Sequence, residues 1–499
     1  MGKMDRLIQQ MYRAREKQEP FVLLLGNGAS IASGIKPNKT IVAEILAEYE
    51  DELPAGSTAQ KLQDVWDKHD HLRTEFAERF LTPTRVSPGY RALAQLIQMG
   101  LFNPIVTLNF DTILEDELRA IGFNKFTVLF REPDADEGLL SELSRDDGNV
   151  KILKLHKPYA RDSFLYMANE LPSAHYPAEV EEALHQLFRR NVIVCGYSFA
   201  DLCVTNAFAS IPGRKESFHY VSPEGVKGAS RDLATVIPGR ENEAYEQTFD
   251  YFFEDLDNRV VSESIRRDFP LPIARPYSLL VRSQSQEEKV SNLQNLFENV
   301  LRFVWAVMLA DAVSVQAADP ERQRLRTAVD ESIRLCSLEN VVECCAEFTQ
   351  CCQSSGSTLF SEPFMDFFRK NLREIREVAK AILSGSLGPH AEPDVYGRYH
   401  REVFAMLKNL RWMGSYKLTV ELTWSIQAIT RKAWHLLLRG EKAMSVERYQ
   451  IQGDVNARLR LWNAAGSHSV DLYPALICQL DGGRESEIVG ECCFYYAKS

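Results

Sequence analysis

Apolar positions follow two different patterns along the chain, and the pattern changes near residue 270. Before that point, short apolar runs of strand length are separated by stretches whose apolar residues recur three or four positions apart, the spacing of one helical face. The runs predict strands at 20–26, 104–109, 126–130, 150–156, 191–196 and 217–222. The spaced stretches predict helices at 39–51, 60–80, 89–99, 111–121 and 178–190.

Strands that alternate with helices in this way are typical of βαβ units. The run Val192-Ile193-Val194-Cys195 is apolar throughout, as expected for a strand that is covered on both faces. We therefore expect the first part of the chain to be an α/β fold, a Rossmann-like parallel sheet with helices on both faces.

The proline-rich stretch 270–276 interrupts this pattern and predicts a boundary. Helical spacing then dominates from about residue 293 to 412. From Leu418 to Ile426 apolar and polar residues alternate strictly, which predicts a half-buried strand, and 456–462, 470–479 and 487–496 also look extended, with a turn at 481–483. The sequence thus predicts three parts: an α/β domain at 1–269, a helical regulatory or oligomerisation region at 270–414 and a small β-rich region at 415–499.

Composition narrows the class of protein. A chain of 499 residues with 45% hydrophobic residues is long enough to bury large cores, and its net charge of −11 argues against a general nucleic-acid-binding surface. Its ten cysteines include no Cys-x-x-Cys pair, so we expect reduced thiols and no structural zinc site. Neither a signal sequence nor a membrane span is evident, and we expect a cytoplasmic protein without membrane contact.

The candidate chemistry lies where predicted strands end. Gly26-Asn27-Gly28 follows the first strand, Asn109-Phe110-Asp111 the second, and His156 ends the run 150–156. Carboxyl ends of parallel strands share one edge of a sheet, where ligands bind. The glycine pair alone fits a tight turn as well as a phosphate loop, because the P-loop lysine and the third small residue of a dinucleotide fingerprint are missing. Asp111 fits a helix cap as well as a ligand contact.

The continuation of the loop is more specific. Gly26-x-Gly28-x-Ser30-x-x-Ser33-Gly34-Ile35 resembles the nucleotide loop of the sirtuin family, and Asn109-x-Asp111 and Leu155-His156 resemble its catalytic motifs. Gly196-Tyr197-Ser198-x-x-Asp201 and the aromatic segment 249–256 resemble the sirtuin-like branch found in bacterial antiphage defence proteins. The resemblance covers about residues 15–260. It implies catalytic roles for Asn109, His156 and Asp111, and NAD contacts from Gly26, Gly28, Ala29, Ser30, Ser33, Ile35, Phe110, Gly196, Ser198, Asp201 and Ser222.

Departures from the protein-deacylating sirtuins point to a different reaction. Residues 157–191 contain no cysteine, although deacylases carry a four-cysteine zinc module there. Lys157 follows the histidine in place of glycine, and Asn27 and Ser222 also differ from the usual residues. These features are similar to those of the zinc-independent NAD hydrolases of antiphage systems, so NAD is expected as a substrate and no metal is expected.

The resemblance implies an NAD⁺ glycohydrolase that produces nicotinamide and ADP-ribose, acting as a triggered abortive-infection effector. The implied partners are further copies of the chain and an activating protein, which could be a translocase-type ATPase, a short Argonaute or a phage protein. Two alternatives stay open at this point. One is a non-catalytic module that binds NAD or ADP-ribose while the C-terminal half contacts a partner; the other is a deacylase, which the missing cysteines oppose.

Overall fold

The structure is a computed structural model in which the chain forms two compact units, Met1–Val260 and Val261–Ser499. The described residues are 2–53, 55–69, 71, 75–130, 138–156, 175–200, 202–211, 216–231, 233, 242–312, 319–335, 337–353, 360–426, 430–437, 455–472, 476–480 and 490–494.

The first unit is built around a seven-stranded sheet in the order β3-β4-β2-β1-β5-β6-β7, and all neighbouring strands are parallel. The strands are β1 Phe21–Leu25, β2 Phe102–Thr107, β3 Phe126–Phe130, β4 Val150–Lys154, β5 Val192–Cys195, β6 Phe218–Ser222 and β7 Asn242–Glu246. The predicted Rossmann-like parallel sheet is confirmed, with β7 as a strand that the apolar pattern does not reveal.

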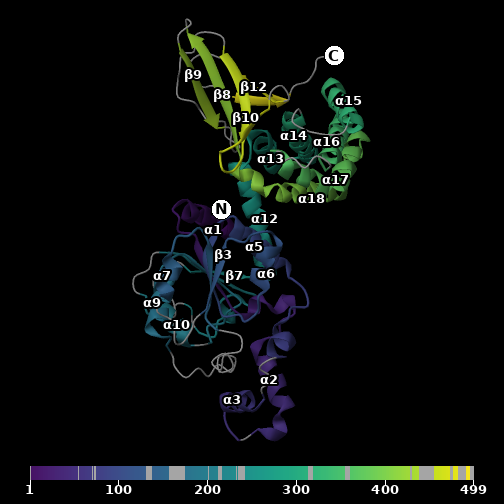
Figure 1. Cartoon of the computed structure of the whole chain (residues 1–499). Helices are drawn as coiled ribbons and strands as arrows, with labels where there is room; N and C mark the ends of the chain where they lie inside the picture. Colours follow the sequence, from purple (N-terminus) through teal and green to yellow (C-terminus); the bar gives the residue numbers. More distant parts are fainter. Residues whose placement is uncertain are drawn as a thin grey trace. The chain divides into compact units, whose positions relative to one another are not determined.

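Helices cover both faces of this sheet (Figure 1). Side chains from alternate positions of β1 enter two separate apolar cores, with Val22 and Leu24 on one face and Leu23 and Leu25 on the other. The helices are α1 Lys3–Glu16, α2 Asn38–Glu48, α3 Thr58–Lys68, α5 Pro88–Gln98, α6 Ile113–Ala120, α7 Leu139–Ser144, α9 Ala178–Phe188, α10 Leu202–Ala209 and α12 Phe249–Asp268. Helices α1, α5, α6 and α12 pack on one face, and α9 and α10 pack on the other.

The segment after β1 does not lead straight into an α-helix. Two 3-10 turns follow the strand, η1 Asn27–Ala29 and η2 Ile31–Ser33, and Gly34 then takes a left-handed conformation with φ of 94°. The first α-helix beyond them, α2, starts only at Asn38. A compact double turn therefore occupies this edge of the sheet.

The second unit combines helices and strands around one apolar core. Its helices are α13 Leu271–Arg282, α14 Gln286–Ala312, α15 Asp319–Leu335, α16 Leu338–Gln353, α17 Glu362–Leu383 and α18 Pro393–Asn409. Its strands are β8 Lys417–Ile426, β9 Thr430–Leu437, β10 Val455–Trp462, β11 Ser469–Asp471, β12 Leu476–Leu480 and β13 Gly490–Phe494. They form antiparallel sheets in the orders β11-β10-β8-β9 and β12-β13.

The predicted helical and β-rich parts of the C-terminal half are confirmed as elements, but they share one core. Leu418, Leu459, Leu461 and Leu472 belong to the same buried cluster as the helices α13 to α18. The proline-rich stretch is not a linker. The chain turns between α12 and α13, and Pro270 directly precedes α13, whose first turn tolerates Pro272 because that position needs no intrahelical N–H donor.

Candidate functional site

The order of the strands predicts where a ligand would bind in the first unit. From β1 the chain crosses to β2 on one side, and β5 later joins β1 on the other side. At such a switch point the loops after neighbouring strands diverge and leave a crevice beyond the carboxyl ends. The segments 26–35, 108–112 and 196–200 follow β1, β2 and β5 at this edge.

Two backbone segments of the chain contact each other directly in the crevice. The N–H of Gly28 donates to the carbonyl oxygen of Gly196 over 2.9 Å, and Gly196 has a φ of 67°. A side chain on Gly28 would bring its Cβ within 2.9 Å of the Gly196 Cα, and one on Gly196 would collide with the N atom of Ala29. Glycine is required at both positions because the two backbones approach too closely for a Cβ atom.

The donors of the glycine loop are already used within the protein. Besides Gly28, the N–H groups of Ala29 and Ser30 donate to the carbonyl oxygens of Gly26 and Asn27, each over 3.0 Å. In this conformation the N–H groups of Gly28, Ala29 and Ser30 are therefore bonded within the protein. In a 3-10 turn an N–H group bonds to the carbonyl oxygen three residues earlier, and this pairing uses the donors of Ala29 and Ser30.

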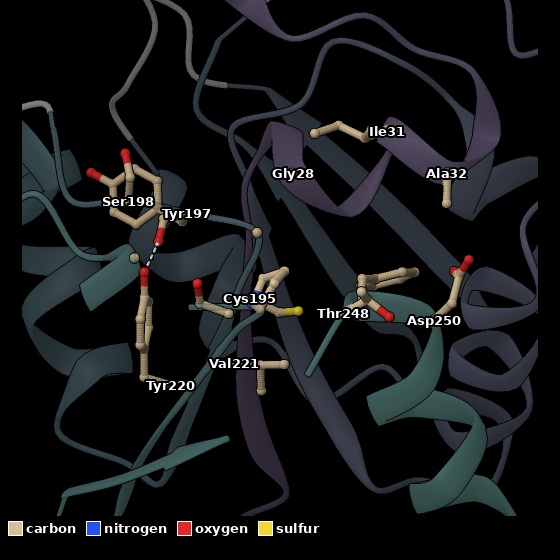
Figure 2. A pocket seen from close by; sticks show the side chains of 15 residues that line it. Gly28, Ile31, Ala32, Cys195, Tyr197, Ser198, Tyr220, Val221, Thr248 and Asp250 are labelled. Atoms are coloured by element: carbon tan, nitrogen blue, oxygen red, sulfur yellow. Dashed lines mark hydrogen bonds between the residues drawn. The ribbon is translucent and has the colours of Figure 1, made fainter. Parts of the chain in front are cut away.

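A pocket of about 340 Å³ opens beside this contact and is shown in Figure 2. Ile31 and Ala32 lie on one side of it, while Tyr220 and Val221 of β6 lie on the opposite side. Its wall also contains Gly28, Cys195, Gly196, Tyr197, Ser198, Ser222, Pro223, Gly228, Thr248, Phe249 and Asp250. The volume is near the lower end of the range of small-molecule sites.

Two hydrogen-bonded groups hold the walls of the pocket in place. Asp250 accepts from the Ser87 hydroxyl over 2.6 Å and from the N–H of Gly89 over 3.0 Å, which ties the start of α12 to the start of α5. Tyr220 donates from its hydroxyl to the carbonyl oxygen of Tyr197 over 3.0 Å, as Figure 2 shows. Burial raises the pKa of Tyr220 to about 12, so this hydroxyl keeps its proton at neutral pH.

A second group of polar side chains is buried at the same edge of the sheet. The Ser30 hydroxyl lies 2.7 Å from the Asp111 carboxylate, 2.8 Å from the Tyr90 hydroxyl and 3.0 Å from the Asn109 side-chain nitrogen. That nitrogen also donates to Tyr90 over 3.4 Å. Asn109 is 5% exposed and Asp111 is 6% exposed. We call these four residues the Ser30 cluster.

Burial dominates the electrostatics of the Ser30 cluster. It raises the pKa of Asp111 above that of an ordinary aspartate, although hydrogen bonds from Ser30 and from the N–H of Ile113 work in the opposite direction. Burial together with the charge of Asp111 raises the pKa of Tyr90 well above its usual value. Asp111 also accepts from the N–H of Ile113 over 3.2 Å, which ties its carboxylate to the first residue of α6.

His156 lies on the neighbouring strand. Thr107 of β2 is paired with Lys154 of β4, so Asn109 and His156 each stand two residues beyond aligned positions of adjacent parallel strands. His156 is buried, its Nε2 lies 3.4 Å from the Tyr176 hydroxyl, and its ring is 6.3 Å from that of Phe110. The register therefore brings the predicted base and the predicted amide to the same edge.

A buried ion pair supports the segment between these residues. Lys154 Nζ lies 2.7 Å from Glu115 Oε1 and donates to the carbonyl oxygen of Asp111 over 2.5 Å. Both side chains are almost fully buried. Lys154 thus links β4 to α6 and to the turn that carries Asp111.

The predicted site residues divide between these places. Gly28, Gly196, Ser198 and Ser222 line the pocket, whereas Ser30, Asn109 and Asp111 form the buried cluster. Gly26 donates its N–H to the Cys195 carbonyl, and Ser33 accepts from the N–H of Ser87. Ala29, Ile35 and Phe110 are buried in the apolar cores. Asp201 and Lys157 lie outside the described residues.

Several residues of the site carry no signal in the sequence. Tyr90 follows Pro88-Gly89 at the start of an ordinary amphipathic helix, and Lys154 and Glu115 look like surface charges. Asp250 falls within the aromatic segment 249–256, so its region could be found but its contacts could not. Among the described residues, no group of three side chains is arranged to hold a metal ion, and no helix is long and apolar enough to cross a membrane.

Part of this unit is similar to a known protein family. Residues 103–225 match the SIR2-like domain. This SIR2-like segment contains Asn109, Asp111, His156, Gly196 and Ser222, and it begins after the glycine loop. A search of curated proteins finds no matching relative.

Solved structures of Sir2 proteins resemble the chain at low identity. A mutant Sir2 homologue in complex with ADP-ribose is 13% identical with a TM-score of 0.31, covering 52% of this chain and 96% of its own. A Sir2 homologue in complex with NAD is 13% identical with a TM-score of 0.30, covering 51% and 93%. Sir2 bound to an acetylated peptide is 16% identical with a TM-score of 0.29, covering 52% and 98%. TM-scores of this size do not by themselves establish a common fold.

Proposed function

We propose that the first unit is an NAD⁺ glycohydrolase, which converts NAD⁺ and water into nicotinamide, ADP-ribose and a proton. The observation that carries the proposal is the meeting, at one sheet edge, of a pocket beside two closely packed glycine turns with a buried amide and a histidine. A site that bound a nucleotide without catalysis would need the pocket but neither Asn109 nor His156.

The pocket fits one part of a nucleotide. Gly28 and Gly196 place main chain without side chains in the pocket wall, and Ser198 and Ser222 offer hydroxyl groups to a ribose or a phosphate. The Oδ1 atom of Asn109 is buried and has no hydrogen-bond partner among the described residues. A buried acceptor of this kind is costly unless a ligand or water satisfies it, which favours a binding role for this residue.

The proposed reaction needs few catalytic groups from the protein. The bond between the ribose carbon and the nicotinamide nitrogen breaks with its electron pair going to the nitrogen, so the leaving group departs neutral and needs no acid. Water then forms the new bond to the carbon and loses one proton. Positive charge develops on the sugar in the transition state, as in glycoside cleavage. Imidazole is the side chain whose ordinary titration lies nearest neutral pH, so His156 is assigned as the base.

The biological setting is also part of the proposal. Destruction of NAD is toxic, and an antiphage effector would therefore be inactive until a partner binds. We assign residues 1–269 to catalysis and the remainder to self-assembly or to an activating protein. Activation would shift an equilibrium between inactive and active states.

The test is loss of NAD and release of nicotinamide by the purified full-length protein, alone and with candidate activating proteins. His156→Ala and Asn109→Ala should each abolish turnover. The matched control is His175→Ala, since His175 is exposed and paired with Glu181 on the surface. If the protein binds NAD but never consumes it with any partner supplied, the enzyme assignment is wrong and a non-catalytic NAD-binding module takes its place.

A further inference from the structure

The hydrogen bonds of the Ser30 cluster run in one fixed order from donor to acceptor, because its members differ in how many protons they can donate. An ionised carboxylate can only accept, and the two oxygens of Asp111 accept from the Ile113 N–H and from the Ser30 hydroxyl. A serine hydroxyl has a single proton. Once that proton points at Asp111, Ser30 can only accept from its two other neighbours.

This constraint passes to Tyr90 and Asn109. Tyr90 lies 2.8 Å from the Ser30 oxygen and must donate its own proton there. The Tyr90 oxygen is then left to accept, as the Ser30 oxygen is. Both groups that face the Asn109 side chain, at 3.0 and 3.4 Å, are therefore acceptors. Only the amide nitrogen of Asn109, which carries two protons, satisfies both of them.

We propose that Asp111, acting through the Ser30 hydroxyl, fixes the amide of Asn109 so that it offers an acceptor and not a donor to the substrate. The acceptor is Oδ1, the buried atom that has no partner among the described residues. The inference rests on the proposed NAD hydrolase function. In that reaction the group bound by Oδ1 is an O–H donor, either the attacking water or a ribose hydroxyl, and Asp111 is a positioning residue rather than a ligand.

The decisive variant is Asp111→Asn, which keeps the shape but changes one acceptor into a donor. The oxygen of the new amide stays with the Ile113 N–H, so its NH₂ faces Ser30 and donates. The Ser30 proton, released from position 111, then turns to Asn109, while the Ser30 oxygen still accepts from Tyr90. The Asn109 amide rotates so that Oδ1 accepts from Ser30 and NH₂ faces the substrate. We expect kcat to fall by about 100-fold or more, the range for loss of a group that orients a proton transfer.

A second substitution should restore the acceptor. In Asp111→Asn/Asn109→Asp, a carboxylate stands at position 109, accepts from the reversed network and still offers an oxygen to the substrate. We expect its kcat to recover to within about 10-fold of the wild type. Asn109→Asp alone should remain impaired, because it places two carboxylates on one serine hydroxyl and like charges there resist joint ionisation.

Tyr90→Phe is the matched control. It removes one of the two acceptors that face the Asn109 nitrogen but leaves the bond between Ser30 and Asp111, which sets the direction. The amide keeps its orientation, and we expect kcat to fall only a few-fold, as for loss of one modest hydrogen bond. A merely structural role for Asp111 predicts no rescue by the second substitution.

The orientation can also be measured without turnover. In protein labelled with ¹⁵N-asparagine, the side-chain NH₂ of Asn109, identified by its loss in Asn109→Asp, should exchange slowly with solvent and should exchange faster in Asp111→Asn. Rapid exchange in the wild type, or a double variant no more active than Asp111→Asn, overturns the inference. A wild type that consumes no NAD with any partner would refute the proposed function instead, and slow exchange would still support the fixed orientation.

Discussion

The buried pair of Lys154 and Glu115 allows a sharp prediction of stability. Lys154→Met removes the cation while Glu115 stays buried, and it also takes the donor from the Asp111 carbonyl. Removing one partner of a buried ion pair costs about 3–5 kcal/mol, because the remaining charge is left without compensation. Since whole domains are stable by about 5–15 kcal/mol, the first unit should be severely weakened.

The double variant Lys154→Met/Glu115→Leu removes both charges. Only the Asp111 carbonyl then lacks its donor, a loss of about 1–3 kcal/mol. The double variant should therefore be more stable than Lys154→Met alone, with a coupling energy of about 2–3 kcal/mol. The measurement is urea unfolding of both single variants, the double variant and the wild type. A surface pair such as Arg119 with Asp116 provides the control, and its coupling should stay below about 1 kcal/mol. If the double variant is as unstable as the sum of the singles, the two side chains are not coupled and the reasoning is wrong.

Three further outcomes are expected. Gly196→Ala should destabilise the protein by more than about 1 kcal/mol and abolish ADP-ribose binding in calorimetry. The control is Gly148→Ala, which has a similar φ of 73° but open space around the added Cβ and should affect stability alone. Equal effects of the two substitutions on binding would contradict the packing argument. Burial raises the pKa of Asp111, so its contribution to the free energy of unfolding is full below the unfolded value of about 3.9 and is lost as pH rises through the folded pKa. In urea unfolding from pH 4 to 8, the wild type should lose stability relative to Asp111→Asn as the pH rises. A constant difference in the free energy of unfolding between the two proteins would contradict a raised pKa of Asp111. Cys195 lines the pocket, but burial raises the pKa of its thiol, so a thiol reagent at pH 8 should modify it only after unfolding; prompt labelling of the native protein, located by mass spectrometry, would show otherwise.

The parts of the site that were predictable from sequence are those set by strand ends. Buried parallel strands are recognised from short apolar runs, and residues just beyond them meet at one edge of the sheet. Asn109 and His156 could therefore be placed together from the sequence alone, and the register of Thr107 with Lys154 agrees. Gly28 and Gly196 follow from the same logic, because they come three residues and one residue after the ends of two paired strands, β1 and β5.

What could not be predicted depends on packing between distant elements. Tyr90 reaches Ser30 only because α5 packs on the sheet with one particular rotation, which periodicity alone does not determine. Strand β7, with the sequence Asn-Glu-Ala-Tyr-Glu, lies at the edge of the sheet and lacks the apolar run that marks central strands. The double 3-10 turn after β1 depends on a local choice of hydrogen bonds that glycine permits but does not dictate.

The contact between Gly28 and Gly196 also affects how this pocket could change during evolution. Because a Cβ atom at either position would collide with the facing backbone, substitutions of these two residues cannot adjust the pocket in small steps. New ligand preferences would have to arise at other residues that line the pocket, such as Ser222 and Thr248, which take no part in the contact between Gly28 and Gly196. Descendants of this protein that bind other ligands should therefore carry their substitutions in β6 and in the segment before α12, while Gly28 and Gly196 stay the same.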